Sequence, residues 1–223
     1  MRLILLGIVV LKRTFAAHYS FFMSKISLKR QAEALIPTEW GSFRMLAYAR
    51  RSDEPIPHLA LVADTFDKAQ QPILLRVHSE CMTGDVFHSN RCDCGEQLDV
   101  AMQQAAKQGG LVIYLRQEGR GIGLINKLKA YKLQDKGFNT ADANTHLGFE
   151  ADARTYQDAI SILKDLKIEK VNLLTNNPLK VKALEDAGIT VVKRLPILIT
   201  PKTENTFYLK TKKDLMGHLL GDL

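Results

Sequence analysis

The sequence has few cysteines, and their number excludes a protein that disulfides hold together. Only three occur among 223 residues, at Cys81, Cys92 and Cys94, so at least one thiol stays unpaired. The CxC pair is also too close for an easy mutual disulfide. A chain of this length buries a core without such bonds. We therefore expect a protein of a reducing compartment, the cytoplasm, and another use for its thiols.

The sequence also lacks a clear membrane-spanning segment. Leu3 to Leu11 is almost wholly apolar, but Lys12 and Arg13 close this run before it could cross a bilayer. A signal peptide is the alternative, although no clean small-residue cleavage site follows. We expect residues 1–22 to be an N-terminal extension outside the fold, with Met23 as the working start, and we expect no membrane association.

Acidic residues are the minority among the charged side chains. The chain has 24 Asp and Glu against 31 Lys and Arg, a formal net charge of +7 and a pI near 9.3. Such a charge attracts nucleic acid, a membrane surface or a phosphorylated small molecule. The basic residues stand singly, without the interleaved aromatics of a nucleic-acid-binding face. We expect no nucleic acid as partner. The alternative function class is a nucleic-acid-binding protein that zinc stabilises.

Alternating strand and helix patterns predict an α/β fold with a mixed, largely parallel sheet flanked by helices. Short apolar, β-branched segments predict buried strands at 73–77, 111–115, 171–174 and 189–192. Between them, apolar residues recur at helical spacing in three sets: Leu98, Ala101, Met102, Ala105 and Ala106; Leu124, Ile125, Leu128 and Tyr131; Tyr156, Ala159, Ile160, Leu163 and Leu166. Residues 37–62 predict a small N-terminal β appendage, and residues 26–223 a single domain.

A glycine-rich loop, QEGRGIG, follows the strand predicted at 111–115 and opens a helix. Ligands of α/β proteins collect at such carboxyl ends of strands. The GxGxG pattern differs from the dinucleotide fingerprint, and a simple tight turn explains its glycines as well. Arg120 within the loop and Glu118 before it favour a phosphate site, because a flexible turn gains nothing from a paired cation and carboxylate.

Two further helix starts carry a cation. Arg154 precedes a predicted cap at Thr155, whose spacing to Asp158 resembles a capping box. A guanidinium beside free helix amides suggests a phosphate ligand, and the alternative is an ion pair with Asp152.

The other start is TNNP, where Asn177 is a plausible cap and Pro178 occupies the first helical position. Lys180 in the first turn opposes the helix dipole unless an anion binds nearby. The alternative is a solvated surface lysine.

The three cysteines predict a zinc site. Ten residues separate Cys81 from Cys92, and the CxC spacing lets Cys92 and Cys94 reach one ion from a turn. A structural site would need His78 or His88 as fourth ligand, whereas a catalytic site leaves that position to water. We favour the open catalytic form, and three unrelated thiols are the alternative.

Zinc-activated water needs an electrophile, and the basic loops suggest which one. The cations that would hold a polyphosphate are Arg76, Arg120, Arg154 and Lys180. They point to a nucleotide whose base is attacked, such as guanine at its imidazole carbon. Glu118 or Glu80 could accept hydrogen bonds from guanine N1 and its amino group. The residues alone predict a zinc-dependent nucleotide hydrolase.

Seven motifs occur in the order found in GTP cyclohydrolase II: RVHSECMTGD, RCDCG, RQEGRGIGL, LQDKGFNT, LGFEADAR, LLTNNP and MGHLL. The chain resembles this family from about Pro37 to Leu220. The resemblance implies hydrolysis of GTP to formate, pyrophosphate and a diaminopyrimidinone ribosylamino phosphate, the first committed step of riboflavin biosynthesis. It also implies one Zn²⁺ per chain, Mg²⁺ with the GTP phosphates, and a cytoplasmic homodimer.

The resemblance assigns roles position by position. Cys81, Cys92 and Cys94 become the zinc ligands. The implied GTP contacts are Arg76, Val77, His78, Ser79, Glu80, Gln97, Glu118, Gly119, Arg120, Thr140, Thr175 and Lys180. Asp152 becomes the proton acceptor, Arg154 the proposed nucleophile toward the α-phosphate, and Tyr131 a residue that supports loss of the formyl group. Because a guanidinium is a poor nucleophile, we favour Arg154 as a stabiliser of charge.

Two positions depart from the family pattern, with Ala153 in place of a glutamate and Leu179 in place of a lysine. They leave open a paralogue with altered purine triphosphate preference or a silent regulatory GTP binder. Tyr131 could also be a core aromatic, since it continues the spacing of Leu124 and Leu128. Nothing the size of a dihydroxybutanone phosphate synthase domain precedes Pro37, so we expect a monofunctional chain.

Overall fold

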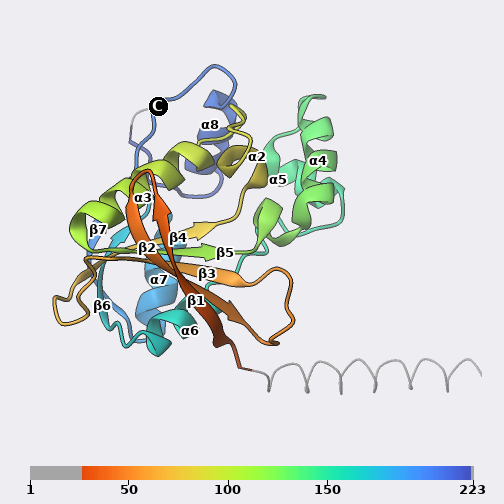
Figure 1. The fold of residues 1–223 in the computed structure, drawn as a ribbon. Helices are drawn as coiled ribbons and strands as arrows, with labels where there is room; N and C mark the ends of the chain where they lie inside the picture. Colours follow the sequence, from red (N-terminus) through yellow and green to blue (C-terminus); the bar gives the residue numbers. More distant parts are fainter. Residues whose placement is uncertain (1–26, 222–223) are drawn as a thin grey trace, which may run out of the picture.

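The computed structural model describes residues 27–221, and the predicted extension at 1–22 lies outside them. Seven strands form one sheet in the order β1-β2-β3-β5-β4-β6-β7 (Figure 1). Their bounds are β1 Lys29–Thr38, β2 Gly41–Ala49, β3 His58–Ala63, β4 Ile73–Ser79, β5 Leu111–Leu115, β6 Lys170–Leu174 and β7 Thr190–Leu195. Strands β4 to β7 pair in parallel, while β1, β2 and β3 pair antiparallel. The predicted α/β class is confirmed.

The N-terminal strands extend this sheet and do not form a separate appendage. Strand β3 pairs antiparallel with β5, with Leu61 opposite Val112. The three strands predicted first along the chain are present, and the fourth runs to Leu195, three residues beyond its predicted end. The sheet is therefore mixed, because β5 pairs antiparallel with β3 and parallel with β4.

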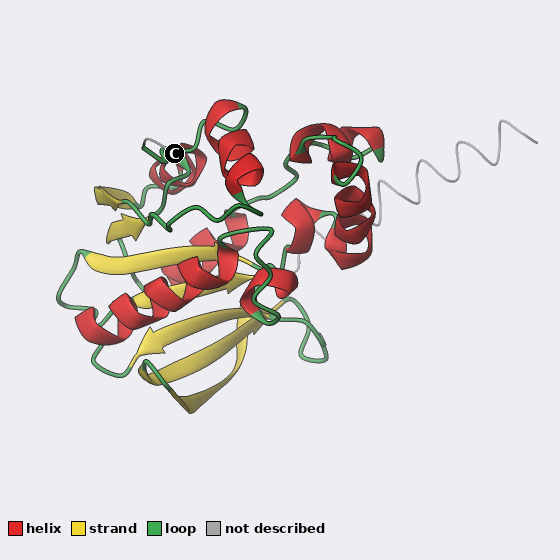
Figure 2. Ribbon diagram, turned by 90° about the horizontal axis from the view of Figure 1, so that it is seen from above, coloured by secondary structure: helices red, strands yellow, loops and turns green. Residues whose placement is uncertain are grey.

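Helices cover both faces of the sheet and one of its ends. They are α2 Met82–Asp85, α3 Cys94–Gln108, η1 Glu118–Gly121, α4 Gly123–Gln134, α5 Thr140–His146, α6 Gln157–Asp165, α7 Pro178–Asp186 and α8 Thr206–Asp214. Helix α3 lies on one face, and α6 and α7 lie on the other (Figure 1). Helices α4 and α5 form a lobe beside the sheet (Figure 2). None of the helices between residues 27 and 221 has the length and apolarity of a membrane span.

The alternation of side chains along β5 creates two cores. Leu111 and Ile113 face α6 and pack with its buried residues, which include Leu163. Val112 points to the other face and packs with Met102 of α3. The predicted apolar faces of α3 and α6 are therefore confirmed, because a strand buried on both sides needs an apolar helix on each.

The predicted apolar face of α4 is wrong. Ile125 and Leu128 are 73% and 51% exposed, whereas Lys127 and Ala130 are buried. Helix α4 belongs to the lobe, and its buried side faces the cysteines. Lys127 can be buried there because a thiol and a carboxylate receive its ammonium group.

The structure also corrects one of the two predicted caps. Helix α6 begins at Gln157 without a side-chain cap, and Asp158 instead pairs with Arg50 and His58. The cap at Asn177 is confirmed, since its side chain accepts a hydrogen bond from the backbone N–H of Leu179.

Truncation of Leu163 to alanine should lower the free energy of unfolding by about 2–5 kcal/mol. This side chain is fully buried between α6 and the sheet, so its removal leaves a cavity. Chemical denaturation measures the loss. Leu179→Ala is the matched control, because Leu179 is 56% exposed and its loss should cost less than about 0.5 kcal/mol. Equal effects of the two substitutions would contradict the described core.

Candidate functional site

Two helix starts bring the three cysteine thiols together. Cys81 follows β4 at the start of α2, and Cys92 and Cys94 lie at the start of α3. Their Sγ atoms all lie within 4.8 Å of one another. A Cβ on Gly95 would lie 2.3 Å from the carbonyl oxygen of Gly84, so the close approach of these two segments requires glycine. The backbone thus creates the cluster that the spacing predicted.

The donor set fits zinc. Tetrahedral zinc with Zn–S bonds of about 2.3 Å places sulfur atoms about 3.8 Å apart, and the Cys81 and Cys92 sulfurs are 3.6 Å apart. Hydrogen bonds from Cys92 and Cys94 lower the pKa of Cys81 far below its ordinary value. This direction favours the thiolate at Cys81, the form in which cysteine binds metal.

A cation and a carboxylate support this thiolate. Lys127 Nζ lies 3.0 Å from Cys81 Sγ and 2.8 Å from Glu118 Oε1. Although burial opposes it, the charge of Cys81 raises the pKa of Lys127, so the side chain stays an ammonium.

The histidines weighed as a fourth ligand do not join the cluster. His78 Nε2 contacts both carboxylate oxygens of Asp85, and burial lowers its pKa. Among the histidines, aspartates and glutamates that the structure describes, none completes the cluster with the three cysteines. Among the described residues, the three cysteines are therefore the group that could hold a metal ion.

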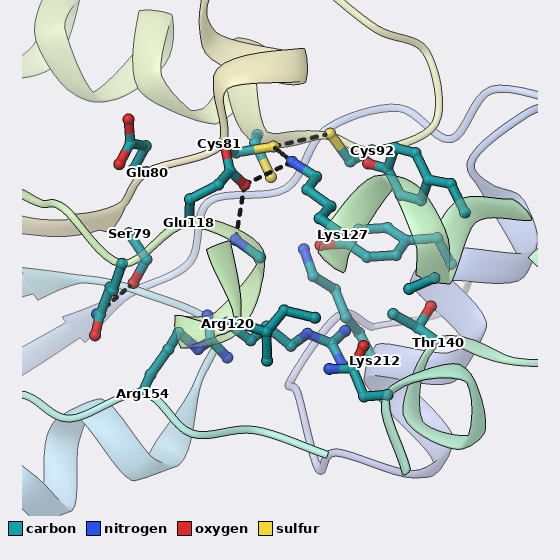
Figure 3. Close-up of a pocket in the computed structure, with 18 of the residues that line it drawn as sticks. Ser79, Glu80, Cys81, Cys92, Glu118, Arg120, Lys127, Thr140, Arg154 and Lys212 are labelled. Atoms are coloured by element: carbon teal, nitrogen blue, oxygen red, sulfur yellow. Dashed lines mark hydrogen bonds and ion pairs between the residues drawn. The ribbon is translucent and has the colours of Figure 1, made fainter. Parts of the chain in front are cut away.

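Cys81 and Cys92 line one part of a cleft that has two adjoining parts, and Cys94 lines both. The first part has an empty volume of about 680 Å³, and the second about 460 Å³. Both parts are lined by Ser79, Cys94, Arg154, Tyr208, Lys212 and His218. Figure 3 shows Cys81, Cys92, Lys127 and Glu118 together at one end, with Arg120 and Arg154 toward the other.

The second part of the cleft concentrates buried positive charge. Arg76 and Lys180 are both nearly inaccessible, and burial lowers the pKa of each. Lys180 Nζ donates to the carbonyl oxygen of Val77 at 2.7 Å. Arg76 Nε here, and Arg120 Nη2 in the first part, are buried and have no hydrogen-bond partner among residues 27–221. Because unpaired buried donors are costly, they indicate an anionic ligand.

Arg154 lies where the two parts meet, and Asp152 holds it. Arg154 Nε and Nη2 donate to the two oxygens of Asp152 at 2.8 and 2.5 Å. Although burial opposes it, this ion pair raises the pKa of Arg154. The ion pair weighed as an alternative is therefore present, and the paired guanidinium still lines the cleft.

The two candidate base-binding carboxylates differ in their partners. Glu118 accepts hydrogen bonds from the backbone N–H groups of Met82 and Gly119 and from Lys127. Glu80 pairs with Arg116 at 3.0 Å, and burial raises its pKa. Glu118 thus holds the loop through three hydrogen bonds, whereas the partner of Glu80 is the Arg116 guanidinium.

The structure brings most of the predicted site residues to the cleft. Those on the first part are Ser79, Glu80, Glu118, Gly119, Arg120, Tyr131 and Thr140. Those on the second are Arg76, His78, Gln97, Thr175 and Lys180. Val77 contributes only its carbonyl oxygen below Lys180, and Asp152 lies behind Arg154. The departures Ala153 and Leu179 are exposed on the surface.

Tyr131 faces the thiols and does not extend a core. Its hydroxyl lies 3.4 Å from Thr83 Oγ1, and Thr83 in turn contacts Cys81 Sγ. Burial raises the pKa of Tyr131 to about 12, so it stays a hydroxyl donor.

Sequence reasoning missed several residues that line the cleft, among them Lys127, Tyr208, Lys212 and His218. Lys212 Nζ donates to Asp93 Oδ1 at 2.7 Å, and Asp93 stands between two of the cysteines. The one available signal was the terminal MGHLL motif, which contains His218. Nothing local marks the two lysines, because their burial depends on partners far away in the chain.

Comparisons with known proteins agree on one family. Residues 29–196 match the family model described as GTP cyclohydrolase II. A GTP cyclohydrolase-2 of Buchnera aphidicola is 49% identical over 85% of this chain and 97% of its own length. The riboflavin biosynthesis protein RibBA is 50% identical over 87% of the chain in Chlorobium phaeovibrioides and 48% identical over 86% in Bacillus subtilis. The chain spans about half the length of these two relatives, 47% and 48%.

Proposed function

The chain belongs to the GTP cyclohydrolase II family, and from this premise we propose that it opens the imidazole ring of GTP and releases formate and pyrophosphate. The product would be 2,5-diamino-6-(5-phosphoribosylamino)pyrimidin-4(3H)-one, at the first committed step of riboflavin biosynthesis. One observation carries the proposal. A cleft of two adjoining parts has the thiols of Cys81 and Cys92 in the first part, Cys94 on both parts, and the buried cations Arg76 and Lys180 in the second. Thiols and buried cations in one cleft suit a metal-assisted reaction on the base of a nucleoside triphosphate.

The proposal includes one zinc ion per chain, held by Cys81, Cys92 and Cys94. When bound, zinc lowers the pKa of its water ligand and so supplies a nucleophile near neutral pH. Lys127 compensates the thiolate charge at Cys81. Mg²⁺ with the triphosphate, a homodimer and a cytoplasmic location are further parts of the proposal, and the family resemblance supports them.

The chain's own residues divide the work between base and phosphates. Glu80 would accept hydrogen bonds from the guanine N1 and amino groups, because its carboxylate lines the cleft beside Cys81. Arg154 would stabilise charge on the α-phosphate as pyrophosphate leaves, with Asp152 fixing the plane of its guanidinium. The raised pKa of Arg154 supports this role over that of a nucleophile.

Incubation of the purified protein with GTP, Mg²⁺ and Zn²⁺ tests the proposal. We expect formate and pyrophosphate in equal amounts, together with the diaminopyrimidine product. ATP in place of GTP tests for a paralogue with another purine preference. GTP binding without formate would identify a silent GTP binder and defeat the proposed activity.

Tyr131→Phe should slow formate release by about tenfold or more while leaving GTP binding intact. The hydroxyl lies beside the thiol cluster, where a donor can assist loss of the formyl group. Chromatography should then show a formylamino product accumulating. Tyr48→Phe is a matched control, since the Tyr48 hydroxyl bonds Asp165, outside the cleft. Full formate release by Tyr131→Phe would show that the Tyr131 hydroxyl takes no part in the reaction and that the side chain only packs.

A further inference from the structure

The C-terminal segment, helix α8 and residues 215–220, covers part of the cleft. Tyr208, Lys212 and His218 from this segment line both parts of the cleft. A backbone hydrogen bond from Leu219 N–H to the Asn176 carbonyl attaches it, and His218 N–H bonds the Lys212 carbonyl within the segment. Asn176 lies in the loop between β6 and α7, next to Thr175 and Lys180. The segment is thus attached where the buried cations gather.

Lys212 connects this segment to the cysteine loop. Its ammonium group lies 2.7 Å from Asp93 Oδ1, and Asp93 Oδ2 accepts a hydrogen bond from Gln97. The side-chain Oε1 of Gln97 in turn accepts from Arg76 Nη2 at 2.6 Å. Lys212 therefore has a structural partner already, and its position is set by the loop that carries two of the cysteines.

His218 is different, because its ring has a donor site to spare. His218 Nε2 is buried and makes no hydrogen bond with any described residue. Burial, followed by the charges of Lys212 and Arg154, lowers the pKa of His218 to about 3. The ring is neutral near pH 7, and the tautomer with hydrogen on Nε2 can donate one hydrogen bond.

The neighbours of His218 indicate what should accept that bond. The largest charge effects on the ring come from Lys212, Arg154, Lys180 and Arg120, which are cations. The cleft carboxylates that suit a guanine base, Glu80 and Glu118, line the part with the thiols and do not line the second part. A ligand group that meets His218 therefore meets positive charge, which selects a phosphate oxygen.

We propose that His218 is a substrate-positioning residue whose Nε2 donates a hydrogen bond to the polyphosphate chain of the bound nucleoside triphosphate. The C-terminal segment would thereby complete the phosphate half of the cleft. The inference rests on the proposed function for the identity of the nucleotide, but it concerns the polyphosphate alone. It can therefore be tested without turnover.

Calorimetric titration of the full-length protein with inorganic tripolyphosphate and Mg²⁺ provides the test, and guanosine serves as a probe of the base site. His218→Ala should weaken tripolyphosphate binding about tenfold or more, because a hydrogen bond to a charged group is lost. Guanosine binding should stay within about twofold. His218→Gln, which keeps an N–H donor, should recover most of the affinity. Leu219→Ala is the matched control, since Leu219 lies in the same segment with its side chain 48% exposed.

Kinetics with GTP give a second readout. A positioning role predicts a higher KM for His218→Ala and a smaller change in kcat, again with recovery in His218→Gln. Unchanged tripolyphosphate affinity in His218→Ala would overturn the inference, as would an equal loss for tripolyphosphate and guanosine. If the wild-type protein binds tripolyphosphate through His218 but releases no formate, the proposed function fails and this inference stands.

Discussion

Replacement of Cys92 by serine is expected to remove zinc from the protein and to slow formate release from GTP by more than about 100-fold. Substitutions in the second shell of metal sites already cost about 10–100-fold, and Cys92 is a direct ligand in the proposed site. Its sulfur lies 3.6 Å from that of Cys81, and both side chains are buried. A serine hydroxyl would stay protonated there and bind zinc poorly. Atomic absorption measures the metal content, and a coupled assay measures formate.

The cysteine experiment has two readouts that must agree. The control is Val86→Ala, because Val86 follows α2 with 60% of its side chain exposed and should leave zinc and turnover unchanged. Circular dichroism and a denaturation curve confirm that the variant is folded. A zinc-free Cys92→Ser protein with full formate release would contradict the metal-dependent reaction.

Arg154→Lys should lower the rate of pyrophosphate release by about 100- to 1000-fold, the range found when one preorganised donor to a developing charge is lost. The guanidinium of Arg154 makes two hydrogen bonds to Asp152, at 2.8 and 2.5 Å, and lines both parts of the cleft. A lysine ammonium lacks the planar fork and cannot keep both bonds while also reaching a phosphate. Steady-state kinetics with a pyrophosphate assay measure the effect.

A second arginine offers a control for this substitution. Arg50 pairs with Asp158 at 2.7 Å outside the cleft, so Arg50→Lys should change turnover by less than about twofold. Normal turnover in Arg154→Lys would defeat the assigned role. A GMP adduct on Arg154, detected by mass spectrometry after rapid quenching, would favour the nucleophile over the charge stabiliser.

Local patterns were sufficient for the strands and for the thiols. Strand β5 lies at its predicted bounds because an apolar, β-branched run between polar turns has few other ways to be buried. The cap at Asn177 was equally local, since its side-chain Oδ1 accepts from the backbone N–H of Leu179 two residues away. Spacing placed Cys92 and Cys94 on one turn, and glycines at 84 and 95 supply the close approach to Cys81.

Patterns failed where a side chain had two possible surroundings. The apolar spacing of Ile125 and Leu128 predicted a helix face against a core, but α4 stands in a lobe and exposes both. Thr155 and Asp158 have the spacing of a capping box, yet Asp158 found Arg50 and His58 from the N-terminal strands. For Asp158, the deciding partners lie 108 and 100 residues away along the chain. For Ile125 and Leu128, the position of α4 in the lobe decided that they are exposed.

The sequence by itself determined the α/β class, the three thiols and the family, because hydrophobic period, cysteine spacing and motif order are properties of short segments. Only the tertiary structure decided which cations are buried and what each one faces. Lys127 needs Cys81 as partner and Lys212 needs Asp93, and neither pair is close in sequence. The physical reason is that burying a charge requires a partner that the fold supplies.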